Sequence, residues 1–184
     1  DGVTYFDTEN KESFTNNVFA GGVSGDLEFS DNDAEFSKNA ILNGSGNTFR
    51  IYGDNDNNQL NQTVYFSKNL FSGHSSGSYL EHGITGSGQT YVSTTLNNMI
   101  NNDEFYIRAG SVNSSVENNY WGTTTESEIQ AMVYDWNDDA SLGFLDYDPY
   151  LTAPSTLAPV SPPKNVVKQS TSGGVQLSWA ANPE

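Results

Sequence analysis

Residues 66–71 read Phe-Ser-Lys-Asn-Leu-Phe, and their frame, bulky-x-x-Asn-x-apolar, occurs five times along the chain. The five copies are FTNNVF (14–19), FSKNAI (36–41), FSKNLF (66–71), TLNNMI (95–100) and VENNYW (116–121). Their asparagines are Asn17, Asn39, Asn69, Asn98 and Asn119, which stand 22, 30, 29 and 21 residues apart. A unit that repeats at this interval is typical of a solenoid, in which each turn of the chain stacks on the previous one.

Short alternating runs between Gly, Asn, Asp and Ser clusters predict that each turn is made of strands. In a stack of parallel strands each residue lies about 4.8 Å from its counterpart one turn earlier, so identical side chains stack. The repeated asparagines are then expected to form a ladder of amide–amide hydrogen bonds at a corner. The alternative is that they only supply left-handed turn residues. The same stacking predicts interior columns of Phe14, Phe36 and Phe66, and of Phe19, Ile41, Phe71 and Ile100.

The pattern changes after Gly122. Thr125 and Glu128 have the spacing of a capping box, and the apolar residues after it follow a helical period. These apolar residues are Ile129, Met132, Val133 and Trp136. The sequence therefore predicts one short amphipathic helix, whose apolar face covers the open end of the stack.

The C-terminal part has a different composition. Residues 152–163 (TAPSTLAPVSPP) predict an extended, exposed linker between a first domain, 1–151, and a second, 164–184. The second begins with two alternating strands joined by a Ser-Gly-Gly turn. Two strands alone bury too little surface to be stable. We therefore expect further modules of the same polypeptide.

Composition excludes several classes of partner. Seven Lys and Arg against 23 Asp and Glu give a net charge of −16, which opposes binding to nucleic acid or anionic lipid. The chain has no cysteine, which excludes disulfides and thiolate metal sites. No apolar run approaches the roughly 18 residues of a membrane span.

The Asn-Asn-x-Trp-Gly ending at 118–122, with the segment after it, resembles the C-terminal end of right-handed parallel β-helix proteins of the pectate-lyase-like type. The residues that carry the resemblance are Asn119, Trp121, Gly122, Ile129, Asp138, Asp139, Gly143, Tyr147, Pro149 and Leu151. The tail from about Pro162 resembles the first two strands of a fibronectin type III module, with Trp179 at the place of its core tryptophan. The resemblance implies an all-β fold: a right-handed parallel β-helix with a short capping helix, then a partial β-sandwich module.

Enzymes of the pectate-lyase-like family use a basic residue with calcium, or paired aspartates. Here Lys38 and Lys68 occupy equivalent places before a frame asparagine, and stacked lysines would suit an anionic polysaccharide. The alternative is two solvated turn residues. His74 and His82 lie close together in sequence and form a candidate acid/base pair, or belong to a surface loop.

Calcium is a second candidate ligand. Asp54, Asp56 and Asn58 stand at alternate positions in GDNDNNQ (53–59), a spacing that lets a bent loop converge on a hard cation. The bidentate glutamate of an EF-hand is missing, and the alternative, which the acidic composition favours, is an Asx-rich turn.

Two functions remain open. The first is a non-catalytic β-helix segment of an exported, multi-module surface protein, acting as a rod, an adhesin or a glycan-contact surface. The second is the C-terminal end of a polysaccharide lyase or related carbohydrate-active enzyme. The missing catalytic signatures favour the first, and the resemblance implies an extracellular or cell-surface location.

Overall fold

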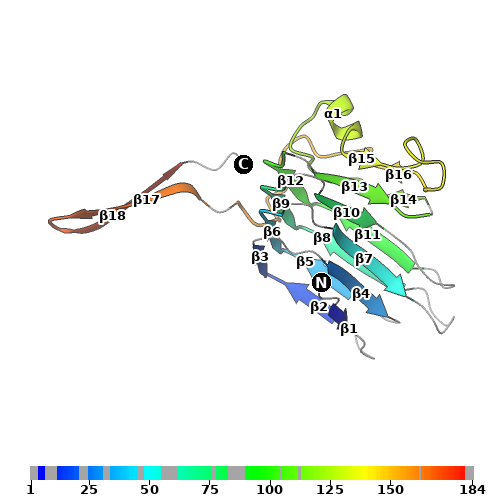
Figure 1. Ribbon diagram of the computed structural model, residues 1–184, viewed down its shortest axis with the longest axis horizontal. Coiled ribbons are helices and arrows are strands. Elements are labelled where there is room, and N and C mark those ends of the chain that lie inside the picture. The colour runs from blue at the N-terminus through cyan, green and yellow to red at the C-terminus, as the bar shows by residue number, and fades with distance from the viewer. Residues whose placement is uncertain are drawn as a thin grey trace.

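The computed structural model of the chain is all-β, with parallel sheets and, among the residues that it describes, one short helix. It describes residues 4–6, 12–20, 25–30, 34–44, 48–54, 62–75, 78–82, 90–103, 105–111, 113–161 and 163–180. Most of these residues form short strands in three stacks that lie side by side (Figure 1). The predicted all-β class is confirmed.

Each stack is a parallel sheet. The first contains β1 (Thr4–Phe6), β4 (Gly25–Ser30), β7 (Thr48–Asp54), β10 (Ser78–His82), β13 (Phe105–Ala109) and β15 (Val133–Tyr134). The second contains β2 (Glu12–Thr15), β5 (Ala34–Ser37), β8 (Gln62–Ser67) and β11 (Thr90–Thr95). The third contains β3 (Val18–Ala20), β6 (Ala40–Leu42), β9 (Leu70–Ser72) and β12 (Asn98–Ile100).

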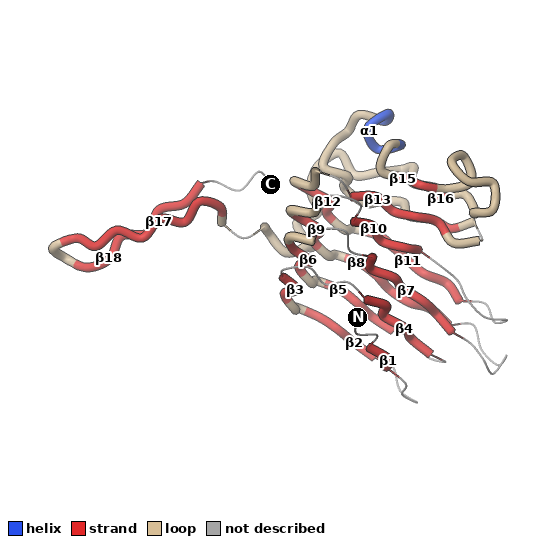
Figure 2. The backbone as a smooth tube through the Cα atoms, in the orientation of Figure 1, coloured by secondary structure: helices blue, strands red, loops and turns tan. Residues whose placement is uncertain are grey.

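The chain visits the first, second and third sheets in turn and then returns to the first, which we call one circuit. Neighbours within a sheet are therefore one circuit apart in sequence, as in the pairing of Phe14 with Phe36 and of Phe36 with Phe66. Figure 2 shows the strands of successive circuits lying one above the other. This regular pairing brings every repeated side chain next to its counterpart.

A two-residue corner joins the second sheet to the third in every circuit. Its first residue has a left-handed backbone, with φ between 56° and 62° in the first four circuits. Its second residue is an asparagine, and these asparagines form the ladder described below. The left-handed residues are Asn16, Lys38, Lys68 and Leu96, and Asn118 continues the row. A single left-handed residue redirects the strand within so short a connection, at a cost of roughly 1–2 kcal/mol for residues other than glycine.

Two columns of stacked side chains from the second and third sheets run through the interior, where they meet buried residues of the first sheet such as Leu80 and Ile107. Phe36 and Phe66 lie face to face with ring centroids 5.1 Å apart, and both are fully buried. Thr94 pairs with Phe66 and continues that column. In the second column Met99, rather than the predicted Ile100, pairs with Phe71. Stacking in register gives each ring a neighbour above and below, which favours contact between aromatic rings.

The top of the stack is closed by α1 (Glu126–Gln130), β14 (Ser114–Ser115), β15 and β16 (Leu145–Asp146) (Figure 1). Ile129, Val133, Leu142 and Leu145 are buried against the main core. The helix is shorter than the predicted apolar period requires. The chain leaves it after Gln130, and Val133 pairs with Ile107 as a strand, so the helical period does not continue to Trp136, which is 47% exposed.

The predicted capping box is also wrong. Thr125 is the N-cap residue, but its side chain makes no capping hydrogen bond. The hydroxyl of Thr123 instead donates to the Glu128 carboxylate. Glu126 and Glu128 still place negative charge in the first turn of the helix.

Residues 152–161, the greater part of the predicted linker, are exposed at half of their positions but run along the third sheet; we call them the strap. Ser155 N donates to Asn98 Oδ1 at 2.7 Å, and Asn98 Nδ2 donates to Ser155 O at 3.0 Å. Ala158 and Ser161 are buried. The third sheet has a second apolar cluster on the face turned away from the main core, formed by Ala40, Leu42, Leu70 and Ile100. Because Leu70 is fully buried, this face must be covered, and the strap lies over it.

The C-terminal strands β17 (Lys164–Thr171) and β18 (Gly174–Ala180) form an antiparallel hairpin that projects away from the three sheets (Figure 2). Val175, Leu177 and Trp179 alternate along β18, and each is more than half exposed. The hairpin turn lies at Ser172 and Gly173, where the sequence predicts it.

In the part of the chain that the structure describes, no helix is both long enough and apolar enough to cross a membrane.

Candidate functional site

The corner between the second and third sheets carries a ladder of asparagine side chains. Each Oδ1 accepts two hydrogen bonds from the asparagine one circuit earlier, one from its backbone N and one from its Nδ2. Asn69 Oδ1, for example, accepts from Asn39 N at 2.9 Å and from Asn39 Nδ2 at 3.2 Å. The second Nδ2 hydrogen of Asn69 goes to Phe36 O at 3.0 Å. Every polar position of the Asn69 amide is used, which is what burial at a corner requires.

The ladder runs through Asn17, Asn39, Asn69, Asn97 and Asn119. The prediction of Asn98 as the fourth member is wrong by one residue. Asn97 Oδ1 accepts from Asn69 N at 2.8 Å and from Asn69 Nδ2 at 3.0 Å. Asn98 is instead the first residue of β12, pairs with Leu70, and holds the strap. The correct frame is therefore 94–99, in which Thr94 takes the place of the bulky residue.

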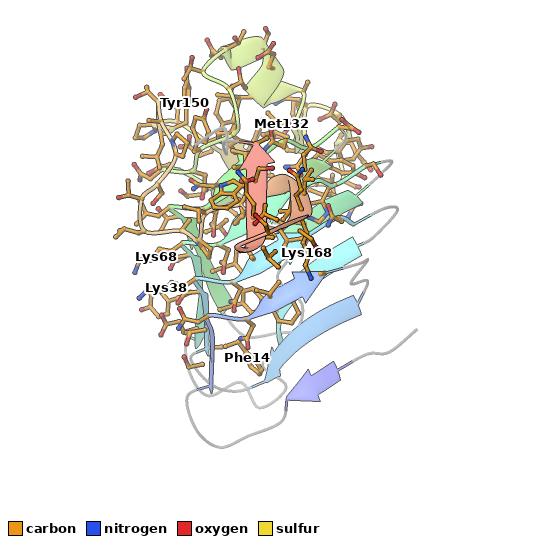
Figure 3. The ribbon with its side chains drawn as sticks, turned by 90° about the vertical axis from the view of Figure 1, so that its left-hand side faces the viewer. Phe14, Lys38, Lys68, Met132, Tyr150 and Lys168 are labelled. Atoms are coloured by element: carbon orange, nitrogen blue, oxygen red, sulfur yellow. The ribbon has the colours of Figure 1, made fainter. Side chains whose placement is uncertain are left out.

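Lys38 and Lys68 occupy the left-handed position of consecutive corners and lie one circuit apart. Lys38 N donates to Ser67 O at 3.3 Å, and Lys68 N to Thr95 O at 3.1 Å. Both side chains lie at the same edge of the stack and point outward, one above the other (Figure 3). The structure thus brings the two predicted lysines together at the surface. The two lysines do not belong to a longer row of basic residues, because the equivalent positions of the neighbouring corners are Asn16 and Leu96.

His74 is buried and lies just after the third sheet, where its side chain is hydrogen-bonded to the main chain of the previous circuit. Its Nε2 donates to Ile41 O at 3.1 Å, and one circuit later Asn102 Nδ2 donates to Phe71 O at 3.2 Å. Since Ile41 pairs with Phe71, the two bonds are equivalent, and His74 N also donates to Asn102 Oδ1. A carbonyl only accepts, so Nε2 carries the proton. Burial lowers the pKa of His74 below its ordinary value of 6.5, against a smaller opposite effect of the Ile41 hydrogen bond.

His82 ends β10, where its backbone pairs with Ala109 and Ile51. Its side chain lies outside the described residues, as does the prediction that it pairs with His74. The Nε2 of His74 is already bonded to the main chain, and the side chain is 4% exposed. This arrangement favours a structural role for His74 over general acid/base catalysis.

The predicted calcium ligands are placed only in part. Asp54 ends β7, where its backbone pairs with Ser30. The Asp54 side chain, Asp56 and Asn58 lie outside the described residues, so the calcium site stays a prediction. Within the described ranges no group of three or more His, Asp or Glu side chains is arranged to hold a metal ion.

A groove of about 330 Å³ lies beside Lys38, between the first corners and the strap. It is lined by Asn16, Asn17, Val18, Lys38, Ala40, Leu157, Ala158 and Pro159. Val18 and Leu157 are 69% and 56% exposed, so the groove is mostly apolar with one cation at its rim. The sequence did not indicate this groove, because it depends on where the strap lies.

The loop between β15 and β16, residues 135–144, carries two exposed aromatic rings. Trp136 and Phe144 are 47% and 43% exposed, and their ring centroids are 5.0 Å apart with 33° between the ring planes. The sequence placed Trp136 in the helical period and gave no indication that Phe144 lies beside it, so this pair was missed. The available signal was two aromatic residues that bracket the turn-rich segment NDDASLG (137–143).

Comparisons of the chain with models of protein families, with curated proteins and with solved structures found no match.

Proposed function

We propose that the chain is a non-catalytic segment of a right-handed parallel β-helix. In this proposal it belongs to an exported, multi-module surface protein, where it acts as a rod or adhesin that presents a glycan-contact surface. The observation that carries the proposal is the asparagine ladder, in which the most regularly repeated polar groups of the chain are all used to join one circuit to the next.

The circuit of three parallel sheets supports the β-helix. Connections between parallel strands are right-handed in nearly all proteins, which favours the right-handed form. Each circuit contacts mainly the circuits before and after it, so added circuits lengthen the molecule along one axis. An elongated molecule of this kind suits the role of a rod. The hairpin beyond the strap is the expected start of the second module, since an exposed two-stranded hairpin is marginal by itself.

The use of His74 supports a non-catalytic role. A general base needs a ring nitrogen within hydrogen-bonding reach of substrate, whereas the His74 imidazole is buried and its Nε2 is bonded to Ile41 O. Lys38 and Lys68 are exposed enough to contact a ligand. Within the described ranges, no group of three or more His, Asp or Glu side chains is arranged to hold a metal ion beside them. A surface of this kind binds rather than cleaves.

Activity assays test the proposal. We expect the full chain, incubated with pectate, alginate or a glycosaminoglycan, with and without calcium, to form no unsaturated product detectable by ultraviolet absorbance. The matched variant is Lys68→Asn, because Asn16 and Asn118 already occupy the same left-handed corner position without disturbing the fold. Unsaturated product from the wild type, lost in Lys68→Asn while the melting temperature stays the same, would overturn the non-catalytic assignment.

A further inference from the structure

The Trp136–Phe144 pair joins the two legs of one loop. Trp136 N donates to Gly143 O at 3.0 Å, which places Trp136 opposite the residue before Phe144. Phe144 is fixed through its main chain, since Phe144 N donates to Asn113 Oδ1 at 2.9 Å and Ser114 N donates to Phe144 O at 2.8 Å. Both rings therefore stand on a backbone that is bonded to the neighbouring circuit.

A buried carboxylate holds the loop from inside. Asp135 is 4% exposed, and its carboxylate accepts from Asn137 N at 3.0 Å and from Leu145 N at 3.1 Å. Asp139 accepts from Ser141 N and Ser141 Oγ, and these bonds lower its pKa below the ordinary value. A buried charge is costly unless it is well bonded. Here that bonding orders a segment whose two largest side chains point into solvent, so a ligand meets rings that are already in place.

The size of the pair selects the kind of ligand. A stable protein interface buries about 800 Å² on each partner. The exposed area of Trp136 and Phe144 is far smaller, because each ring is more than half covered. One or two pyranose rings match two aromatic rings in area. The C–H face of a sugar packs on an aromatic face, and its hydroxyls need polar partners at the edge. Exposed polar residues Asn113, Asn137, Asp138 and Ser141 are in the same loop or bonded to it.

Charge selects among glycans. The chain carries a net charge of −16, and the loop itself contains Asp138 and Asp139 beside the rings. An anionic polysaccharide would be repelled from this end of the molecule. The charge of Arg108 acts on Asp139, so this cation is already partly balanced by a carboxylate of the loop. An uncharged sugar has no such penalty.

We propose that the Trp136–Phe144 pair is a binding site for a neutral glycan, in which a pyranose ring stacks on the exposed aromatic faces. Tyr134 and Trp136 flank the buried Asp135, so Tyr134 also faces outward, and it packs with Tyr106 at a centroid distance of 6.1 Å. These tyrosines offer contacts for a further sugar ring. The inference rests on the proposed function in that it names the ligand class and the site of the glycan-contact surface.

The experiment is a titration of the full chain with cellohexaose, mannohexaose and xylohexaose, followed by tryptophan fluorescence and calorimetry. Hexagalacturonate serves as the charged comparison. Trp121 is 1% exposed, so a fluorescence change comes from Trp136 or Trp179. We expect at least one neutral hexasaccharide to bind more tightly than hexagalacturonate. Its affinity should change little with added salt, because screening acts on charged ligands.

Trp136→Ala and Phe144→Ala should each weaken that binding about tenfold, the effect of losing one aromatic stacking contact. Trp179→Ala and Tyr65→Ala are the matched controls. Each removes an exposed ring from another element, since Trp179 is 61% exposed and Tyr65 is 43% exposed. The proposal is overturned if no neutral hexasaccharide binds, if Trp136→Ala binds as well as wild type, or if hexagalacturonate binds best. Such a result would not contradict the proposed non-catalytic role, because that role is contradicted only by product formation in the lyase assay.

Discussion

Asn69 Nδ2 donates to Asn97 Oδ1 at 3.0 Å, and the two side chains are completely or almost completely buried. The bond joins residues 28 positions apart, in consecutive circuits. With Asn69 N bonded to the same oxygen, it connects the corners where the strand ladders are interrupted.

Asn69→Ala should destabilise the protein by about 2–4 kcal/mol, because Asn39 N and Asn39 Nδ2 lose their acceptor inside the core. Asn17→Ala is the matched control. Asn17 begins the ladder and is exposed, so its loss should cost about 1 kcal/mol or less. Urea unfolding of the two variants measures the difference, and equal losses would show that the interior bonds add nothing beyond the turn itself.

Thr94→Val should stabilise the protein by about 1 kcal/mol. Thr94 continues the phenylalanine column and is 3% exposed, and its Oγ1 is among the described buried atoms without a hydrogen-bond partner. Valine has nearly the same shape and removes the desolvated hydroxyl. Thr95→Val, one residue along and half-buried, should have little effect. Calorimetric melting of both variants checks this, and a lower melting temperature for Thr94→Val would contradict it.

The stability of the protein should fall as the pH drops below 6.5, in part through His74. Its pKa is lowered in the folded state, so the unfolded chain binds the proton more readily. The contribution of neutral His74 is therefore complete above the unfolded value of 6.5 and is lost as the pH falls through the folded value.

His74→Asn isolates this contribution, because Asn102 makes the equivalent main-chain bond one circuit later. The difference in melting temperature between wild type and His74→Asn, measured between about pH 5 and pH 8 where histidine titrates, should shrink as the pH falls. A difference that stays constant over this range would contradict the assignment.

Gly122→Ala should destabilise the protein by about 2 kcal/mol or more. Gly122 has a φ of 78°, and a Cβ there would lie 2.6 Å from Met99 O, so strain and a clash with main chain add together. Gly173→Ala is the control, since a Cβ at that position meets no atom within 4 Å. Thermal unfolding of the two alanine variants should separate them clearly, and similar melting temperatures would show that the backbone around Gly122 adapts to the added Cβ.

Much of the interior follows from the repeated frame alone. Phe14, Phe36 and Phe66 pair as predicted, because residues at one interval in a parallel stack must lie above one another. The frame failed at its fourth copy, where Asn97 and Asn98 are adjacent and either satisfies the pattern. Thr95 and Ile100 favoured Asn98, and no sequence signal marked Leu96 as the left-handed residue that precedes the ladder.

The candidate sites were less predictable. Lys38 and Lys68 share a surface as expected, since they belong to the repeat. His74 lies outside the frame, and its role became visible only through its bond to Ile41, 33 residues away. The position of Trp136 in the sequence fits a helical period. The chain is already in a strand at Val133, which pairs with Ile107, so the helix ends before that period is complete.

The sequence by itself determined the all-β class, the stacking of like residues and the position of asparagine at the corners, because these depend on one short interval that recurs. Only the tertiary structure decided which asparagine holds the strap, which histidine replaces an amide and which aromatic pair faces solvent. Each of these depends on contacts between segments with no common pattern, such as Asn98 and Ser155, which are 57 residues apart. Hydrogen bonds of that kind are made between surfaces that exist only after the circuits have stacked.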